Sequence, residues 1–230
     1  AIVGCGNISG IYLENLTDRN SILIKSYEDQ LIVRTGYSFT YNSANDRNRS
    51  TGNRNPYSIR INVEEAGNLL YLASKTINSK PKIDKGFVIA NIPFAQYIKG
   101  DFDFAQNWNI DNRNSFVFHI GMGVAYPYAN SQMLPFEKRY FSGGPNSVRG
   151  WSVRSFGPGS YKGKEGNVNY INHTGDIKLD LNIEYRTHLF WKLNAAAFID
   201  AGNIWNIRDY EGQEEGTFRF NRFYQQLAVA

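Results

Sequence analysis

Arg149 poses the clearest chemical question in the sequence, because it stands within a run of turn-forming residues. Residues 141–161 read FSGGPNSVRGWSVRSFGPGSY. The Gly-Gly-Pro and Gly-Pro-Gly turns on either side predict a loop that folds back with Arg149 near its tip. A guanidinium is a rigid fork of donors that suits carboxylates, and Glu184 and Asp200 occupy polar positions in the two segments that follow. If the loop enters the protein, these acids are its expected partners. A solvated loop with an unpaired surface arginine fits the same pattern.

Residues that carry covalent or metal chemistry are few and scattered. The three histidines, His119, His173 and His188, stand in different contexts and form no ligand set. There is no Gly-x-Ser-x-Gly motif. The single cysteine, Cys5, allows neither an internal disulfide nor a cysteine metal cluster, and is interpreted as a small residue near a strand start. The sequence therefore predicts no catalytic residue, no metal and no cofactor.

The charge pattern argues against a nucleic-acid partner. The net charge of +4 would suit nucleic acid only if basic residues gathered on one face. They cluster only in residues 45–55, NDRNRSTGNRN, where the accompanying Asn, Ser and Gly favour a solvated loop.

The elements that must position Arg149 and the two acids show a period of two. Apolar and polar residues alternate over six segments, which predicts strands with one apolar and one polar face at 31–41, 57–64, 98–108, 115–126, 177–186 and 193–205. The tail from residue 223 starts a seventh strand. His119 falls on the polar face, which would line the lumen of a closed barrel. Residues 64–77 have room for a short helical turn, and a long loop at about 129–175 separates the fourth and fifth strands.

Strand length and aromatic content favour a membrane barrel over a soluble sandwich. A sandwich shows the same alternation, but segments of roughly ten residues match a transmembrane strand. Aromatic residues make up 15% of the chain, a high content that fits the aromatic girdles of a membrane barrel. No run approaches the roughly 18 apolar residues of a membrane helix. The expected fold class is all-β, an antiparallel transmembrane β-barrel with about seven to eight strands in this chain. Residues 1–230 are interpreted as the C-terminal part of a larger barrel, because the tail stops within an alternating strand and no signal peptide precedes it.

Three motifs, in the same order along the chain, resemble those of the BamA/TamA-like outer-membrane insertase superfamily. GGPNSVRGW, with LPFEKRYF before it and GPGSY after it, resembles the conserved loop, although Trp151 stands where the family usually has Phe or Tyr. NIEYR resembles the acidic position of the next strand, at Glu184. FIDAGNIW resembles a Phe-x-Asp-x-Gly strand motif, at Phe198, Asp200 and Gly202. INVEEAGNLL resembles an earlier barrel strand of the Bacteroidetes-type members. The loop-motif residues are Gly143, Gly144, Val148, Arg149, Gly150 and Trp151.

The resemblance implies a barrel of roughly sixteen strands in the outer membrane of a Gram-negative bacterium. The POTRA domains before it and the last two strands would lie outside this chain. It implies a loop tucked into the lumen, with Arg149 paired to Glu184 and Asp200. The implied function is non-enzymatic: the protein folds and inserts β-barrel proteins, or translocates a passenger.

The implied partners are outer-membrane lipids, unfolded β-barrel substrates, the chain's own POTRA domains, and accessory lipoproteins or an inner-membrane protein. Two alternatives remain open. The barrel could anchor a fused patatin-like phospholipase, or it could be a two-partner secretion pore.

Overall fold

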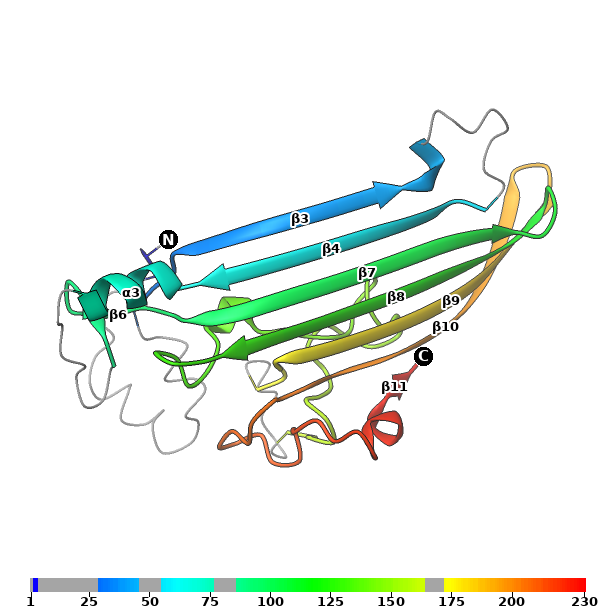
Figure 1. Ribbon diagram of the computed structural model, residues 1–230. Coiled ribbons are helices and arrows are strands. Elements are labelled where there is room, and N and C mark those ends of the chain that lie inside the picture. Colours follow the sequence, from blue (N-terminus) through cyan, green and yellow to red (C-terminus); the bar gives the residue numbers. More distant parts are fainter. Residues whose placement is uncertain (1, 4–28, 46–54, 77–85, 164–171) are drawn as a thin grey trace.

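A computed structural model describes residues 2–3, 29–45, 55–76, 86–163 and 172–230 of the chain (Figure 1). Cys5 and most of the basic run at 45–55 lie outside the described residues.

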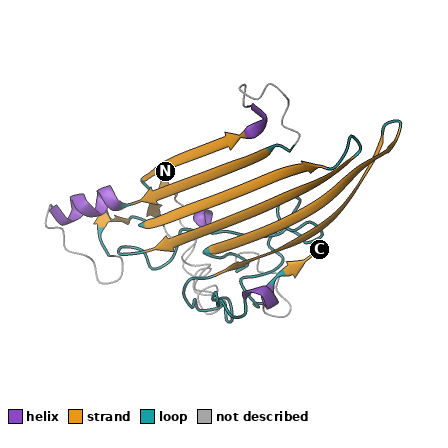
Figure 2. Ribbon diagram, turned by 45° about the vertical axis from the view of Figure 1, so that its right-hand side comes forward, coloured by secondary structure: helices purple, strands orange, loops and turns teal. Residues whose placement is uncertain are grey.

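Seven strands form one antiparallel sheet in the order β11-β10-β9-β8-β7-β4-β3 (Figure 1). Its long strands are β3 (Arg34–Asn42), β4 (Tyr57–Ala66), β7 (Tyr97–Asn109), β8 (Asn114–Pro127), β9 (Ile177–Phe190) and β10 (Leu193–Trp205). Each pairs with its neighbour in the chain order, as in an up-and-down barrel wall. The predicted all-β antiparallel fold is confirmed, and the open, curved sheet fits a partial barrel (Figure 2).

The two faces of the sheet differ in the size and polarity of their side chains. On β8 the large apolar side chains alternate with small buried residues; the exposed ones are Ile120, Met122, Val124 and Tyr126. The exposed set continues onto β3 and β4, where Tyr37 is 69% exposed. Soluble proteins rarely expose an apolar patch that spans several strands. This face is therefore the lipid-facing wall of the barrel.

The height of the apolar band agrees with a bilayer. It runs from the Ile98–Tyr126 pair to the Trp108–Phe116 pair, both between β7 and β8. Ten residues at about 3.3 Å each, tilted by about 40°, span about 25 Å along the barrel axis. That is the height of the apolar band of outer-membrane barrels, about 25 Å.

Short elements lie around the ends of the long strands. β1 (Ile2–Val3) pairs with β2 (Gln30–Leu31), and β5 (Val88–Ile89) pairs with β6 (Ile92–Pro93). The helical elements are η1 (Ser43–Asn45), α3 (Asn68–Thr76), η2 (Phe136–Lys138) and η3 (Phe223–Gln226). Among the described helices, none has the length and apolar character to span a bilayer.

Three predicted elements need correction. The first long strand begins at Arg34 rather than 31, because Gln30 and Leu31 belong to β2. The expected short turn within 64–77 is the nine-residue helix α3. The predicted seventh strand is mostly η3, and only β11 (Ala228–Val229) pairs with β10.

Packing around Trp205 explains the irregular tail. Trp205 meets the ring of Phe218 at 5.5 Å, and Phe218 meets Phe223 at 5.9 Å. The indole N–H of Trp205 also donates to Gln226 Oε1 at 2.8 Å. These tertiary contacts override the alternating pattern, as tertiary context commonly overrides strand propensity.

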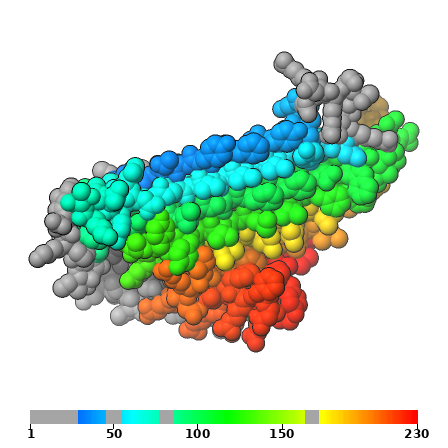
Figure 3. All heavy atoms as spheres, in the orientation of Figure 1, coloured from blue at the N-terminus to red at the C-terminus, as the bar shows by residue number. Residues whose placement is uncertain are grey.

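The long loops after β8 and β10 lie on the inner side of the sheet. Short turns join β7 to β8 and β9 to β10, whereas long connections leave the opposite ends of β8 and β10 (Figures 1 and 2). In the space-filling view, the strands form a continuous surface with the C-terminal residues beneath it (Figure 3). The buried apolar core combines inner-face residues such as Tyr97 and Ala125 with loop residues such as Leu134 and Tyr140. The loop between β8 and β9 is therefore part of the packed structure.

Candidate functional site

The segment around Arg149 folds back on itself as a compact hairpin-like loop. The backbone N–H of Arg154 donates to Ser142 O at 3.0 Å, and that of Gly144 donates to Trp151 O at 2.8 Å. The glycines that flank the arginine adopt the left-handed region, with φ of 90° at Gly143, 91° at Gly144 and 91° at Gly150. At Gly143 a Cβ atom would also lie 2.3 Å from Ser152 O. Only glycine suits such a position, so the motif glycines shape the turn that carries Arg149.

Arg149 lies between the two acids that the sequence analysis named. Its Nε and Nη2 donate to the two carboxylate oxygens of Asp200, at 2.7 and 2.8 Å. Its Nη1 donates to Glu184 Oε2, and its backbone N–H donates to Asp200 Oδ2 at 2.9 Å. The guanidinium also stacks on the Phe198 ring, 3.9 Å from the ring centroid. We call this arrangement of Arg149 with Glu184 and Asp200 the tip anchor.

The charges of the tip anchor are largely buried, so each must be compensated by an opposite charge. The Asp200 side chain is 0% exposed, and the side chains of Glu184 and Arg149 are 15% and 26% exposed. Arg186 Nε donates to the second oxygen of Glu184 at 2.6 Å, so two arginines balance two carboxylates. Hydrogen bonds to Asp200 and then to Glu184 raise the pKa of Arg149 further above its ordinary value. The guanidinium therefore stays charged at any physiological pH.

A second row of contacts lies beside the tip anchor, and the sequence analysis did not identify it. Ser147 Oγ donates to Asp180 Oδ1 at 2.8 Å, and Asn182 Nδ2 donates to Ser147 O at 2.7 Å. Lys178 Nζ pairs with Asp180 Oδ2 at 2.8 Å. Asp180 and Asn182 share the polar face of β9 with Glu184, because all three stand at even positions of an alternating strand. That shared parity was the signal that could have identified them.

Gly202 gives the loop room to approach the sheet. A Cβ atom at this position would lie 2.7 Å from Leu179 O and 2.9 Å from Val148 Cγ2. Val148 is 0% exposed. The close approach of Val148 to β10 therefore requires glycine at position 202.

Trp151 connects the loop to the last described strand. Its indole N–H donates to Val229 O at 3.1 Å, and its ring meets Phe156 edge-on at 5.3 Å. β11 in turn pairs with β10, where Asp200 and Ala230 exchange two backbone hydrogen bonds of 3.0 Å. Asp200 therefore lies beneath the loop tip and beside β11.

The histidines are held in separate hydrogen bonds. His119 Nδ1 lies 2.8 Å from Asn182 Oδ1, and its Nε2 lies 3.6 Å from Asp103 Oδ1. The ring Nδ1 of His173 lies 2.6 Å from Gly157 O, and that of His188 lies 2.9 Å from Asn194 Oδ1. Within the described ranges, no group of His, Cys, Asp or Glu has an arrangement that would hold a metal.

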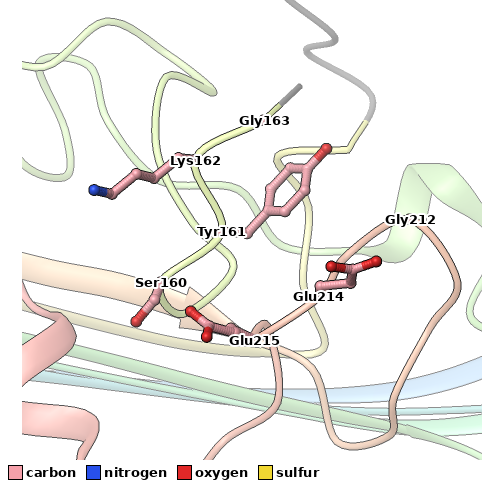
Figure 4. Close-up of a pocket in the computed structure, with 7 residues that line it drawn as sticks. All are labelled: Ser160, Tyr161, Lys162, Gly163, Gly212, Glu214 and Glu215. Carbon is pink, nitrogen blue, oxygen red and sulfur yellow. The ribbon is translucent and has the colours of Figure 1, made fainter. Parts of the chain in front are cut away.

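A hollow lies between this loop and the segment after β10. Figure 4 shows Tyr161 and Lys162 on one side and Glu214 and Glu215 on the other. The two segments touch there, because the backbone N–H of Ser160 donates to Glu215 O at 3.3 Å.

Comparison with known proteins identifies the chain's relatives. Residues 12–226 match the Omp85 superfamily domain. Over 113 residues the chain is 26% identical to the outer membrane protein assembly factor BamA of Neisseria meningitidis serogroup B, a match that covers 46% of this chain and 14% of that protein. A crystal structure of BamA from Haemophilus ducreyi lacking POTRA domains 1–3 aligns with a TM-score of 0.34 and 14% identity, over 80% of this chain and 44% of that one.

These matches span less than half the length of either relative. The Bacteroidetes-type subgroup remains a prediction. The match to the superfamily domain covers nearly all of the chain, from residue 12 to residue 226. The chain belongs to the Omp85 superfamily.

Proposed function

We propose that the complete protein folds β-barrel proteins and inserts them into the outer membrane. The protein is an outer-membrane protein of a Gram-negative bacterium, and its family's role lies in outer-membrane protein assembly or translocation. Insertion is favoured here over passenger translocation because the relative from Neisseria meningitidis is named an outer membrane protein assembly factor.

The observation that carries the proposal is the tip anchor in a chain of this superfamily. Arg149 is held by both carboxylate oxygens of Asp200, and by Glu184, from two adjacent strands. An internal loop held this firmly braces β9 and β10 from inside. Such a brace would hold this part of the barrel wall in place while a strand edge elsewhere in the complete barrel becomes unpaired. An unpaired strand edge is the template on which a client strand adds.

The proposed mechanism needs no covalent chemistry. A client strand would pair with an exposed edge of the complete barrel through main-chain hydrogen bonds and would later leave with its own neighbours. The roles of the described residues are then mechanical. Arg149, Glu184 and Asp200 hold the loop, Val148 and Gly202 let it lie close to the wall, and Trp151 connects it to β11.

The proposed partners follow from this activity. They are outer-membrane lipids at the apolar band, unfolded β-barrel clients at a strand edge, the POTRA domains of the same chain, and accessory lipoproteins or an inner-membrane protein. A client that must traverse the periplasm unfolded exposes alternating apolar residues, and soluble domains beside the barrel would keep it from aggregating.

Reconstitution tests the proposal. Liposomes that contain the full-length protein should insert an urea-unfolded small β-barrel faster than empty liposomes, measured by the heat-modifiable band and by protease protection. The Arg149→Ala protein should accelerate insertion much less. The proposal fails if correctly folded full-length protein, with its accessory partners added, gives the rate of empty liposomes.

A further inference from the structure

A second arginine, Arg139, lies buried at the base of the same loop. Its side chain and that of Asp176 are both 0% exposed. The backbones of Tyr140 and Gly175 exchange two hydrogen bonds of 2.8 Å, so the outgoing and returning arms of the loop meet at this point. Arg139 is ten positions before Arg149 and takes no part in the tip anchor.

Arg139 connects three segments that are distant in the sequence. Its Nη2 donates to Thr174 O at 3.2 Å, to Asn206 Oδ1 at 2.7 Å and to Gln213 Oε1 at 3.2 Å. Asn206 Nδ2 also donates to Gln213 Oε1 at 2.9 Å, and Gln213 Nε2 donates to Thr174 O at 2.9 Å. The returning arm of the loop and the segment after β10 therefore share one buried polar network.

Asp176 gives this network its negative charge and its connection to the sheet. Its Oδ1 lies 3.7 Å from Arg139 Nε, and its Oδ2 accepts the backbone N–H of Ile207 at 3.2 Å. The backbone of Asp176 bonds to Trp205 at 2.7 Å and to Ala125 at 2.8 Å. Burial lowers the pKa of the Arg139 guanidinium and raises the pKa of the Asp176 carboxyl, so each charge depends on the other.

Apolar side chains of similar volume commonly stabilise a fold as well as a buried ion pair does. The attested advantage of a buried polar network is that it selects one arrangement of the segments it joins. Here the arrangement matters because Asn206 and Asp200 are six residues apart along β10 and its end, about 20 Å at 3.3 Å per residue. Contacts at both positions determine where the loop crosses the inner face.

We propose that Arg139 is a positioning residue: with Asp176, Asn206 and Gln213 it forms a base anchor that aligns the loop so that Arg149 meets Asp200. The functional consequence rests on the function proposed above. The placement of the loop does not, and it can be measured separately.

The test measures loop placement by cross-linking in the full-length protein in outer membranes, in a variant free of other cysteines. Ser147→Cys and Asp180→Cys form the reporter pair, because Ser147 Oγ and Asp180 Oδ1 are 2.8 Å apart. Arg139→Met should lower the cross-linking rate about tenfold, since it removes the charged donor that joins the segments. Arg139→Lys should recover part of the rate, because it restores the charge without the fork.

Two further variants keep the test decisive. Lys162→Met removes an exposed charge from the same loop and should cross-link at the parent rate. Gln213→Leu removes one acceptor of Arg139 together with the bonds of Gln213 to Asn206 and Thr174. It should lower the rate by at least about threefold, the effect of one lost hydrogen bond. A folded, heat-modifiable Arg139→Met protein that cross-links at the parent rate overturns the proposal. If that variant does not fold, a parent rate in Gln213→Leu overturns it instead. Folded full-length protein that inserts the client no faster than empty liposomes would refute the proposed function and leave the cross-linking result intact.

Discussion

Replacing Arg149 with alanine should release the loop from β10 while the barrel wall still forms. The substitution removes three side-chain hydrogen bonds to carboxylates and the contact with the Phe198 ring. It leaves Asp200 buried, with the backbone N–H of residue 149 as a remaining donor from the loop. The strands keep their own pairing, because β9 and β10 pair with each other along their length without the loop.

The magnitude follows from burial. Removing one partner of a buried ion pair costs about 3–5 kcal/mol. The lower end applies here, because Arg149 is 26% exposed and Arg186 still neutralises Glu184. A loss of about 3 kcal/mol shifts the equilibrium between docked and undocked loop roughly 150-fold.

Heat modifiability and protease sensitivity measure this effect in the full-length protein. Arg149→Ala should lower the temperature at which the folded band is lost and should expose residues 142–154 to protease. Arg149→Lys should lie between, because lysine keeps the charge but cannot bridge both oxygens of Asp200. Arg154 is the matched control, since it sits in the same loop and stacks on the rings of Phe136 and Phe141. If Arg149→Ala behaves like Arg154→Ala in both assays, the tip anchor does not hold the loop.

Three further predictions concern the wall and its contacts with the loop. At Gly202 a Cβ atom would lie within 3 Å of Val148 Cγ2 and Leu179 O, so Gly202→Val should make the loop protease-sensitive as in Arg149→Ala. Gly100→Val is the control and should leave the loop protected, because a Cβ atom there meets nothing within 4 Å. Met122→Arg, in the middle of the apolar band, should cost about 2–4 kcal/mol in denaturant unfolding, and Tyr126→Arg at its edge at most about 1 kcal/mol; equal costs would mean that this face does not meet lipid. Trp151→Phe should lose only the hydrogen bond to Val229 O, about 1 kcal/mol, with its effect confined to hydrogen exchange near β11; unchanged exchange there would show that the bond contributes nothing.

The sequence alone determined the strands and their faces. A period of two over ten or more residues leaves a strand one way to bury its polar side and expose its apolar side, so five of the six long strands began and ended within a few residues of their expected positions. Parity likewise placed Glu184 and Asp200 on the inner face. The same parity places Asp180 and Asn182 on the inner face, but it does not show that they contact the loop.

Contacts between distant segments were beyond such patterns. The tail alternates like a strand, yet η3 forms because Trp205 and Phe218 offer an aromatic surface to Phe223. Helix α3 begins after Gly67, whose φ of 83° ends β4. Local periodicity shows neither the aromatic contacts of η3 nor this backbone turn.

The choice between a solvated arginine and an anchored one shows the same division. Turn chemistry predicted that Arg149 lies at the tip of a folded-back loop, because glycine and proline restrict the backbone locally. Whether the tip lies in water or on the sheet depends on a contact between Arg149 and Asp200, which are 51 positions apart in the sequence. The base of the loop is decided in the same way, by Arg139 meeting Asn206 and Gln213 across 67 and 74 residues. Local sequence sets backbone conformation and side-chain parity, but only the packed structure brings buried charges to the partners that compensate their desolvation.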